Sequence, residues 1–68
     1  MPTLDLSVLI PVYNEVDNVE PLYHELDAVL RPLGTTYELI FVDDGSTDGT
    51  RPKLEAIHAN DPDHVRLA

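Results

Sequence analysis

Hydrophobic residues along the chain form short continuous runs, separated by a longer stretch in which they recur every three or four positions. Continuous runs cover residues 6–10 and 37–42. Runs of this length, rich in β-branched and aromatic residues, predict buried strands, and their near-continuous hydrophobicity is typical of strands covered on both faces of a parallel sheet. Pro11 follows the first run. Because proline has no N–H to donate, we expect it to end the strand pairing there.

The stretch between these two runs predicts an amphipathic helix. Asp17 suits the N-cap, Glu20 completes a capping box, and Pro21 falls in the first turn, where a missing N–H costs little. Pro32 and Gly34 end the helix. Apolar residues spaced by three and four form one stripe, which consists of Val19, Leu22, Tyr23, Leu26, Val29, Leu30 and Leu33.

A shorter and weaker helical pattern covers residues 50–59, with Asp48 or Ser46 as its cap. Residues 60–63 predict a turn, and residues 64–68 begin a third strand. The histidines are expected at the surface, at positions His24, His58 and His64.

The resulting order, β-α-β-α-β, predicts an α/β fold in a single domain over residues 1–68. Right-handed crossovers would give a parallel sheet with flanking helices, half of a doubly wound fold with its strands in sequence order. The loops at residues 11–17 and 43–49 then open at the same edge of the sheet, where ligands bind in such folds. The outer strand edges stay open, and we expect them to invite self-association.

Composition restricts the class of protein. A chain of 68 residues buries only about 60% of its unfolded surface, and without cysteine it has no disulfide to stabilise it. Its formal net charge of −9 argues against nucleic acid as a partner and favours Mg²⁺ or Mn²⁺ as mediator for any phosphate-bearing ligand. It has neither the apolar run of about 20 residues that spans a bilayer nor a signal-peptide pattern at its start, so we expect a cytoplasmic setting.

The acidic cluster at the end of the second strand is the strongest candidate for chemistry. Asp43 and Asp44 follow the buried run directly, and we interpret them as functional, although they could simply end a strand. For Asp48 we favour the cap. Tyr13 and Glu15 follow the first strand. They suit either a binding edge or an ordinary strand-exit turn with a tyrosine at its rim.

Several familiar sites are absent from the sequence. It has neither Gly-x-Gly-x-x-Gly after the first strand nor the Gly-x-x-x-x-Gly-Lys of a P-loop. Val42 occupies the place that an aspartyl-nucleophile phosphatase would give to its first aspartate. Carboxylates beside an aromatic ring suit a nucleobase and ribose better. Asp43 could accept from a base N–H, Glu15 from ribose hydroxyls, and Tyr13 could pack on the base, with the phosphates left to a metal.

Residues 6–15, Leu-Ser-Val-Leu-Ile-Pro-Val-Tyr-Asn-Glu, and residues 41–50, Phe-Val-Asp-Asp-Gly-Ser-Thr-Asp-Gly-Thr, closely resemble the opening of inverting glycosyltransferases with a GT-A fold. The branch most similar contains dolichyl-phosphate mannose synthase and bacterial polyisoprenyl-phosphate glycosyltransferases. The resemblance implies a Rossmann-like half of a GT-A fold and a UDP- or GDP-linked sugar donor. Carried over by position, the nucleoside pocket would be lined by Pro11, Tyr13 and Glu15, the base contacted by Val42 and Asp43, and the turn supported by Asp44 and Ser46.

The resemblance also implies transfer with inversion, Mg²⁺ or Mn²⁺ held by a later Asp-x-Asp motif, and a catalytic base later still. The sequence ends at Ala68, before such a motif. We therefore expect the N-terminal nucleotide-sugar-binding segment of a longer enzyme, inactive alone, with metal support from Asp43 and Asp44 only indirect. The whole enzyme would act at the cytoplasmic face of a membrane on a lipid phosphate acceptor. The alternative is a noncatalytic nucleotide- or cation-binding module, or a folding fragment without activity.

Overall fold

A three-stranded parallel sheet carries two helices in the computed structural model, which describes residues 5–68. In chain order the elements are β1 (Leu6–Val12), α1 (Val19–Leu30), the 3₁₀ turn η1 (Arg31–Leu33), β2 (Tyr37–Asp43), α2 (Thr50–Asn60) and β3 (Val65–Leu67). The strands lie side by side in the order β1-β2-β3, and both pairs are parallel. The predicted fold class, a Rossmann-like half of a doubly wound sheet, is confirmed.

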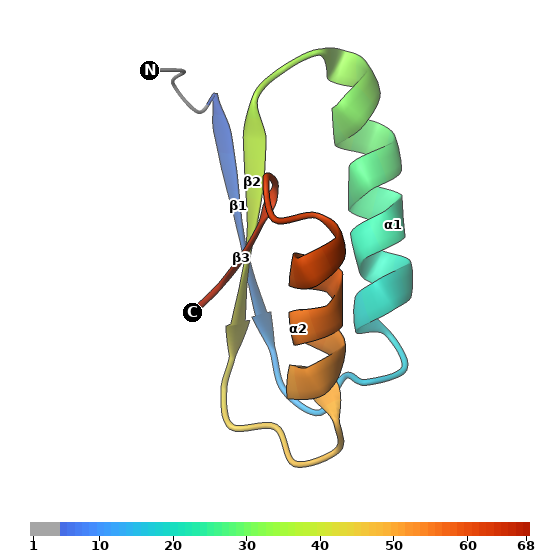
Figure 1. Ribbon diagram of the computed structural model, residues 1–68, viewed down its shortest axis with the longest axis vertical. Helices are drawn as coiled ribbons and strands as arrows, with labels where there is room; N and C mark the ends of the chain where they lie inside the picture. Colours follow the sequence, from blue (N-terminus) through green and yellow to red (C-terminus); the bar gives the residue numbers. More distant parts are fainter. Residues whose placement is uncertain (1–4) are drawn as a thin grey trace.

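Both helices lie on the same side of the sheet (Figure 1). Alternate residues of β2, namely Tyr37, Leu39 and Phe41, are buried beneath them. Neighbouring strands in sequence order, joined by crossovers of one hand, place both connecting helices on one face. The expectation that the strands are covered on both faces is therefore wrong for the described residues.

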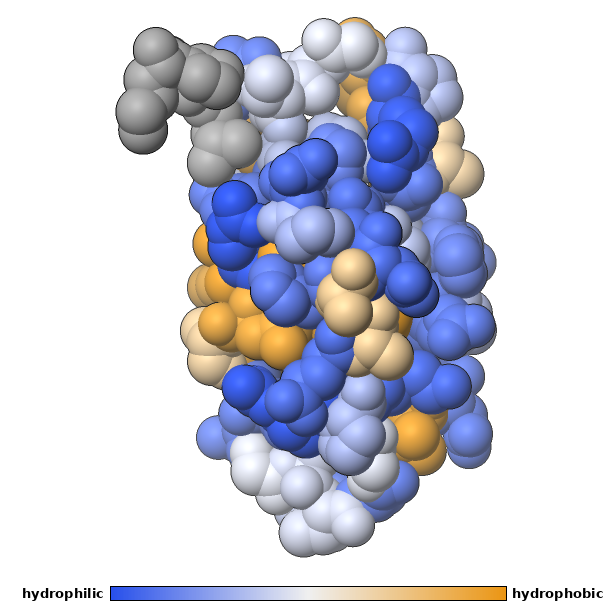
Figure 2. Space-filling model, viewed as in Figure 1, coloured by the Kyte–Doolittle hydropathy of each residue, from blue (hydrophilic) through white to orange (hydrophobic). Residues whose placement is uncertain are grey.

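The opposite face of the sheet carries apolar side chains without a helix over them. Leu9 is 66% exposed, and its register partner Ile40 is half-buried. Pro11 and Val42 form the next pair on this face. Figure 2 shows hydrophobic residues gathered over the strands, on the side away from the helices. In each hydrophobic run, alternate residues therefore lie on the core face of the sheet, and the residues between them lie on the bare face, which no helix of the described residues covers.

The core lies between the sheet and the two helices. Each of these elements contributes at least one side chain with no exposed surface: Val19 from α1, Leu39 and Phe41 from β2, Leu54 from α2 and Val65 from β3. In the part of the chain that the structure describes, Thr50 is the buried polar residue, at the first position of α2.

Pro11 does not end β1. The register continues through Pro11 opposite Val42 to Val12 opposite Asp43, and the carbonyl of Val12 accepts the Asp44 N–H at 3.0 Å. The N–H and C=O of one residue point to the same side of a strand, and neighbouring residues alternate. The nitrogen of Pro11 therefore faces the outer edge of β1, where the missing donor costs no ladder bond.

The start of α1 also differs from the prediction. Its N-cap is Asn18, without a side-chain cap bond, so the capping box of Asp17 and Glu20 is wrong. A backbone turn replaces it, because the carbonyl of Glu15 accepts the N–H groups of Asn18 (2.9 Å) and Val19 (3.0 Å). At the other end, Gly34 adopts the left-handed conformation with φ of 68°, as expected of a helix-ending glycine.

The apolar stripe of α1 is narrower than its spacing predicts. Val19, Tyr23 and Leu30 are buried, but Val29 is 65% exposed and Leu33 is 66% exposed. A sheet of three strands offers the helix a contact surface too narrow to cover the flanking positions. Within residues 5–68, neither α1 nor α2 combines the length and the apolar character that crossing a bilayer requires.

Candidate functional site

The loops that follow β1 and β2 lie against each other at the carboxyl edge of the sheet, at the lower end in Figure 1. They comprise residues 13–18 and 44–49. Three successive N–H groups of the first loop donate to side chains of the second loop or of the helix start behind it: Asn14 to Ser46 Oγ at 2.8 Å, Glu15 to Thr50 Oγ1 at 2.9 Å, and Val16 to Asp48 Oδ2 at 3.3 Å. The predicted convergence of the two loops is therefore present.

Ser46 connects the first loop to a carboxylate. Its hydroxyl accepts from the Asn14 N–H and donates to Asp43 Oδ1 at 2.5 Å, and its own N–H donates to the same oxygen at 3.1 Å. Asp43 is half-buried, whereas Asp44 is exposed. Within the described chain, these bonds occupy Oδ1 of Asp43 and leave Oδ2 for a donor from a ligand.

Asn14 was not singled out from the sequence, yet it shapes the first loop. Among the described residues it is the non-glycine residue with positive φ, at 51°. Its Oδ1 accepts the Thr47 N–H at 2.8 Å, which adds a further bond between the two loops. Asparagine tolerates this left-handed conformation better than most residues, so its place between Tyr13 and Glu15 is the signal that could have identified it.

Thr50 and Asp48 form a second hydroxyl–carboxylate pair. Thr50 is 0% exposed; its hydroxyl accepts from the Glu15 N–H and donates to Asp48 Oδ1. The same Asp48 oxygen accepts the Thr50 N–H at 3.1 Å, so Asp48 does satisfy the first N–H of α2 although the N-cap position is Gly49. These bonds, chiefly the one from the Thr50 hydroxyl, hold the pKa of Asp48 below its ordinary value.

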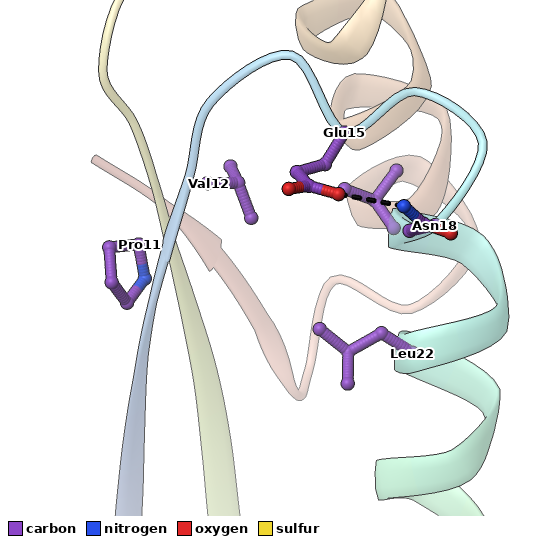
Figure 3. Close-up of a pocket in the computed structure, with 6 residues that line it drawn as sticks. Pro11, Val12, Glu15, Asn18 and Leu22 are labelled. Atoms are coloured by element: carbon purple, nitrogen blue, oxygen red, sulfur yellow. Dashed lines mark hydrogen bonds between the residues drawn. The ribbon is translucent and has the colours of Figure 1, made fainter.

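A cavity of about 270 Å³ lies beside these loops, between the end of β1 and the start of α1 (Figure 3). In Figure 3 the Glu15 carboxylate lies at one end of the cavity, where Asn18 Nδ2 donates to Glu15 Oε2 at 2.8 Å, and Leu22 lies at the other. The lining residues are Pro11, Val12, Glu15, Asn18, Val19 and Leu22.

The predicted site residues divide between the cavity and the loops. Pro11 and Glu15 line the cavity. Tyr13 is 57% exposed and stands on the first loop. The other predicted residues do not line the cavity but lie at the end of β2 and on the loop after it, at positions Val42, Asp43, Asp44 and Ser46.

A separate polar cluster lies at the opposite end of the sheet, where β2 and β3 begin. Its contacts are Tyr23 OH donating to Asp61 Oδ2 at 2.6 Å, Tyr37 OH donating to Asp27 Oδ1 at 2.7 Å, His64 Nδ1 lying 2.9 Å from Asp61 Oδ1, and Arg31 bonding to both carboxylates. His58 and His64 are half-buried rather than at the surface. His58 Nδ1 lies 2.7 Å from the Val65 carbonyl. His24 is exposed as predicted.

The cluster shifts the pKa values of its members. The Arg31 hydrogen bonds lower the pKa of Asp27 against the opposing effect of burial. Burial acts to raise the pKa of Asp61, but hydrogen bonds from Tyr23 and His64 hold it below its ordinary value. Burial, together with the nearby Asp27, raises the pKa of Tyr37 to about 12. The cluster therefore stabilises ionised carboxylates and neutral phenols.

Comparison with known families identifies the family to which this chain belongs. Residues 7–68, nearly the whole chain, match the model of glycosyl transferase family 2. The chain belongs to this family. The resemblance carried by residues 6–15 and 41–50 is confirmed, and the sheet with its two helices is consistent with a Rossmann-like half of a GT-A fold.

Relatives of this family 2 chain are similar over most of its length. It is 54% identical over 52 residues to an uncharacterized glycosyltransferase of Synechocystis sp., covering 76% of this chain and 16% of the relative. It is 44% identical over 67 residues to an undecaprenyl-phosphate 4-deoxy-4-formamido-L-arabinose transferase of Yersinia pestis, covering 98% and 20%. The corresponding transferase of Klebsiella pneumoniae is 39% identical over 64 residues, covering 94% and 20%. The chain thus spans a fifth or less of the length of these relatives.

The family 2 chain does not provide a metal centre within its described residues. Among residues 5–68, no group of three or more His, Cys, Asp or Glu side chains could hold a metal ion. Asp43 is a possible metal ligand, but its Oδ1 already accepts two hydrogen bonds from Ser46. The described residues therefore do not fit Mg²⁺ or Mn²⁺ by themselves.

Proposed function

We propose that this chain forms the nucleotide-binding part of a glycosyltransferase whose donor is a UDP- or GDP-linked sugar. The observation that carries the proposal is the set of hydrogen bonds that join the first loop to the second loop and to the start of α2, from Asn14 to Ser46 and from Glu15 to Thr50. Ligands of open α/β sheets bind at this edge, and a site whose walls are held before the ligand arrives loses less entropy on binding. Membership of glycosyl transferase family 2 supports the donor class.

Each predicted residue has a role in this proposal that its position allows. The exposed ring of Tyr13 packs on the nucleobase, and Oδ2 of Asp43 accepts from a base N–H. The carboxylate of Glu15, at the cavity, accepts from ribose hydroxyls. Pro11 and Val42, paired on adjacent strands, would line the nucleoside pocket and contact the base respectively, while Asp44 and Ser46 support the turn.

The complete reaction is also part of the proposal. The relatives named for undecaprenyl-phosphate support a polyisoprenyl phosphate acceptor, which is a membrane lipid, so the whole protein would act at the cytoplasmic face of a membrane. The sugar would be transferred with inversion. Mg²⁺ or Mn²⁺ would neutralise the donor phosphates, with its ligands and the catalytic base supplied by residues outside this sequence. The formal net charge of −9 supports a cation as mediator.

Amide NMR on the 68-residue chain, titrated with UDP and with GDP in the presence and absence of Mg²⁺, tests the binding site. We expect shifts concentrated at Tyr13, Glu15, Asp43 and Asp44, larger for the base that the site prefers and larger with the metal. A well-dispersed spectrum that neither nucleotide perturbs, or shifts confined to the Tyr23–His64 end of the sheet, would contradict the proposed site.

A matched pair of charge-removing variants sharpens this test. Asp43→Asn replaces the proposed base acceptor, whereas Asp63→Asn removes the same charge from an exposed position in the turn before β3. We expect the first variant to weaken nucleotide binding and the second to leave it unchanged. Equal weakening in both would mean that overall charge, and not the site, governs binding.

A transfer assay with donor and polyisoprenyl phosphate should give no turnover, and metal-dependent transfer would disprove the inactivity of this chain alone.

A further inference from the structure

The backbone of Glu15 is held by a path of hydrogen bonds that ends on a carboxylate of the other loop. Its N–H donates to Thr50 Oγ1 at 2.9 Å, and Thr50 Oγ1 donates to Asp48 Oδ1. The second oxygen of Asp48 accepts the next N–H, that of Val16, at 3.3 Å. We propose that Thr50 and Asp48 are positioning residues that fix Glu15 for nucleotide binding. The part of this inference that concerns the ligand rests on the proposed function.

The chemistry of a hydroxyl group explains why the path runs through Thr50. A hydroxyl has one proton to donate and lone pairs to accept with. Because Asp48 takes the proton, the lone pairs of Thr50 Oγ1 are directed to the Glu15 N–H, and a charged acceptor strengthens such a chain. The pKa of Asp48 is lowered by its bond from Thr50, so the carboxylate is ionised at neutral pH.

The path is anchored in the core. Thr50 has no exposed surface and occupies the first position of α2, so close packing around it restricts the rotation of its side chain. The Glu15 side chain is held separately, by Asn18 at the start of α1. The main chain and the carboxylate of this one residue are therefore fixed from two different helices. That arrangement restrains both ends of the side chain at the cavity.

Helix capping does not account for these contacts. Asp48 satisfies the first N–H of α2 directly, through its bond from the Thr50 N–H at 3.1 Å. The Thr50 hydroxyl takes no part in that cap bond, and the hydrogen bond from the Glu15 N–H to the hydroxyl satisfies no backbone group of α2. Residues 15 and 50 are 35 positions apart, so this bond serves the junction between the loops.

Three variants of near-equal size test the role of the hydroxyl. Thr50→Val keeps the shape and removes the hydroxyl, Thr50→Ser keeps the hydroxyl, and Thr47→Val makes the same change at an exposed threonine on the loop before α2. The measurements are hydrogen exchange of the Glu15 amide without ligand, and dissociation constants for UDP and GDP in Mg²⁺. Amides of Leu39 and Phe41 report whether the core is intact.

We expect Thr50→Val to speed exchange of the Glu15 amide about tenfold and to weaken binding of the preferred nucleotide about tenfold, as loss of one partly buried hydrogen bond would. Exchange at Leu39 and Phe41 should stay within about twofold, the margin that separates local loosening from global unfolding. Thr50→Ser should restore both values, and Thr47→Val should change neither. If Thr50→Val fails to fold, Asp48→Ala, made at an exposed side chain, should speed exchange at Glu15 and Val16.

The outcomes separate this inference from the proposed function. An unchanged Glu15 amide in Thr50→Val, or an equal change in Thr47→Val, would overturn the positioning role. A loosened Glu15 amide with unaltered nucleotide affinity would overturn its link to binding. If the unmodified chain binds neither nucleotide, the proposed function fails for this chain, and the exchange data alone decide whether Thr50 and Asp48 position Glu15.

Discussion

The imidazole of His64 is stacked on the phenol ring of Tyr37, with ring centroids 4.2 Å apart and an angle of 12° between the planes. Tyr37 begins β2, and His64 directly precedes β3. The stacked pair belongs to the polar cluster in which Asp61 accepts a hydrogen bond from Tyr23 and Asp27 accepts one from Tyr37. The end of the sheet opposite the candidate site is therefore held by polar contacts between side chains, in addition to the apolar core.

Tyr23→Phe should destabilise the chain. The variant removes the hydroxyl that donates to Asp61 Oδ2 at 2.6 Å and leaves a partly buried carboxylate with one donor fewer. A hydrogen bond to a charged group contributes roughly 1.5–3 kcal/mol, so we expect a loss in this range in the free energy of unfolding by urea. Tyr13→Phe is the matched control, because Tyr13 is exposed and its change should stay within about 0.5 kcal/mol. Equal effects would show that the cluster adds no stability.

Stability should fall in acid. The pKa values of Asp27, Asp48 and Asp61 are lowered in the folded chain. Between the folded and unfolded pKa values the unfolded chain binds more protons, so this contribution is complete above an unfolded pKa of about 3.9 and is lost as the pH falls below it. Urea unfolding from neutral pH down to about pH 2 measures the loss. A stability curve that is flat through this range would contradict the assignment.

Stability should also fall in alkali, for the opposite reason. Tyr37 has a folded pKa of about 12 against an ordinary value of 10.0, so the neutral phenol is favoured by folding. This contribution is present below the unfolded pKa and is lost as the pH rises from about 10 to about 12, where the unfolded chain has released the proton. Tyr37→Phe should remove part of this alkaline decline. An unchanged decline in the variant would show that Tyr37 is not its source.

Substitutions at Asn14 should separate backbone strain from the loss of a hydrogen bond. Both Asn14→Gly and Asn14→Ala lose the bond from the Thr47 N–H, but only alanine also places a Cβ at a φ of 51° without a compensating side-chain contact. We expect a cost of about 1 kcal/mol for glycine and about 2 kcal/mol or more for alanine in urea unfolding. Asn60→Ala, at the exposed end of α2, is the control. A smaller cost for alanine than for glycine would exclude strain at this position.

The two faces of the sheet should respond differently to truncation. Phe41→Ala removes a fully buried ring and should cost about 3–5 kcal/mol, which approaches the whole stability of a small domain. Leu9→Ala, on the bare face, should change stability by less than about 0.5 kcal/mol. Circular dichroism with urea measures both. A large cost at Leu9 that grows with protein concentration would show that copies of the chain cover this face in solution.

The order of elements could be predicted from the sequence because it follows from local patterns. The apolar run that contains Leu39 and Phe41 ends at two aspartates, and Gly34 marks the end of the first helix; neither conclusion needs a distant partner. The covering of the sheet could not be predicted in the same way. Leu9 and Leu39 have the same hydrophobicity, and only the placement of both helices on one face leaves the first exposed and the second buried.

The candidate site was predicted in part for similar reasons. Tyr13, Glu15 and Asp43 were found because they follow strand ends, where the fold class itself concentrates ligands. The roles of Asn14 and Thr50 were missed because they depend on bonds to residues 33 and 35 positions away, which leave no local pattern. The N-cap of α2 is Gly49 and not Asp48 or Ser46 as predicted, although Asp48 accepts the Thr50 N–H; the bond from the Val16 N–H to Asp48 leaves no local pattern in the sequence.

The bonds between the two loops also determine when the binding edge can form during synthesis. Every side-chain bond that joins the loops spans at least 32 residues. While β1 and α1 emerge from the ribosome, the N–H groups of Asn14 and Glu15 have only water as a partner. They find their acceptors once residue 50 has emerged and α2 has docked. The candidate edge therefore cannot form before residue 50 has been synthesised, although half of its residues are translated earlier.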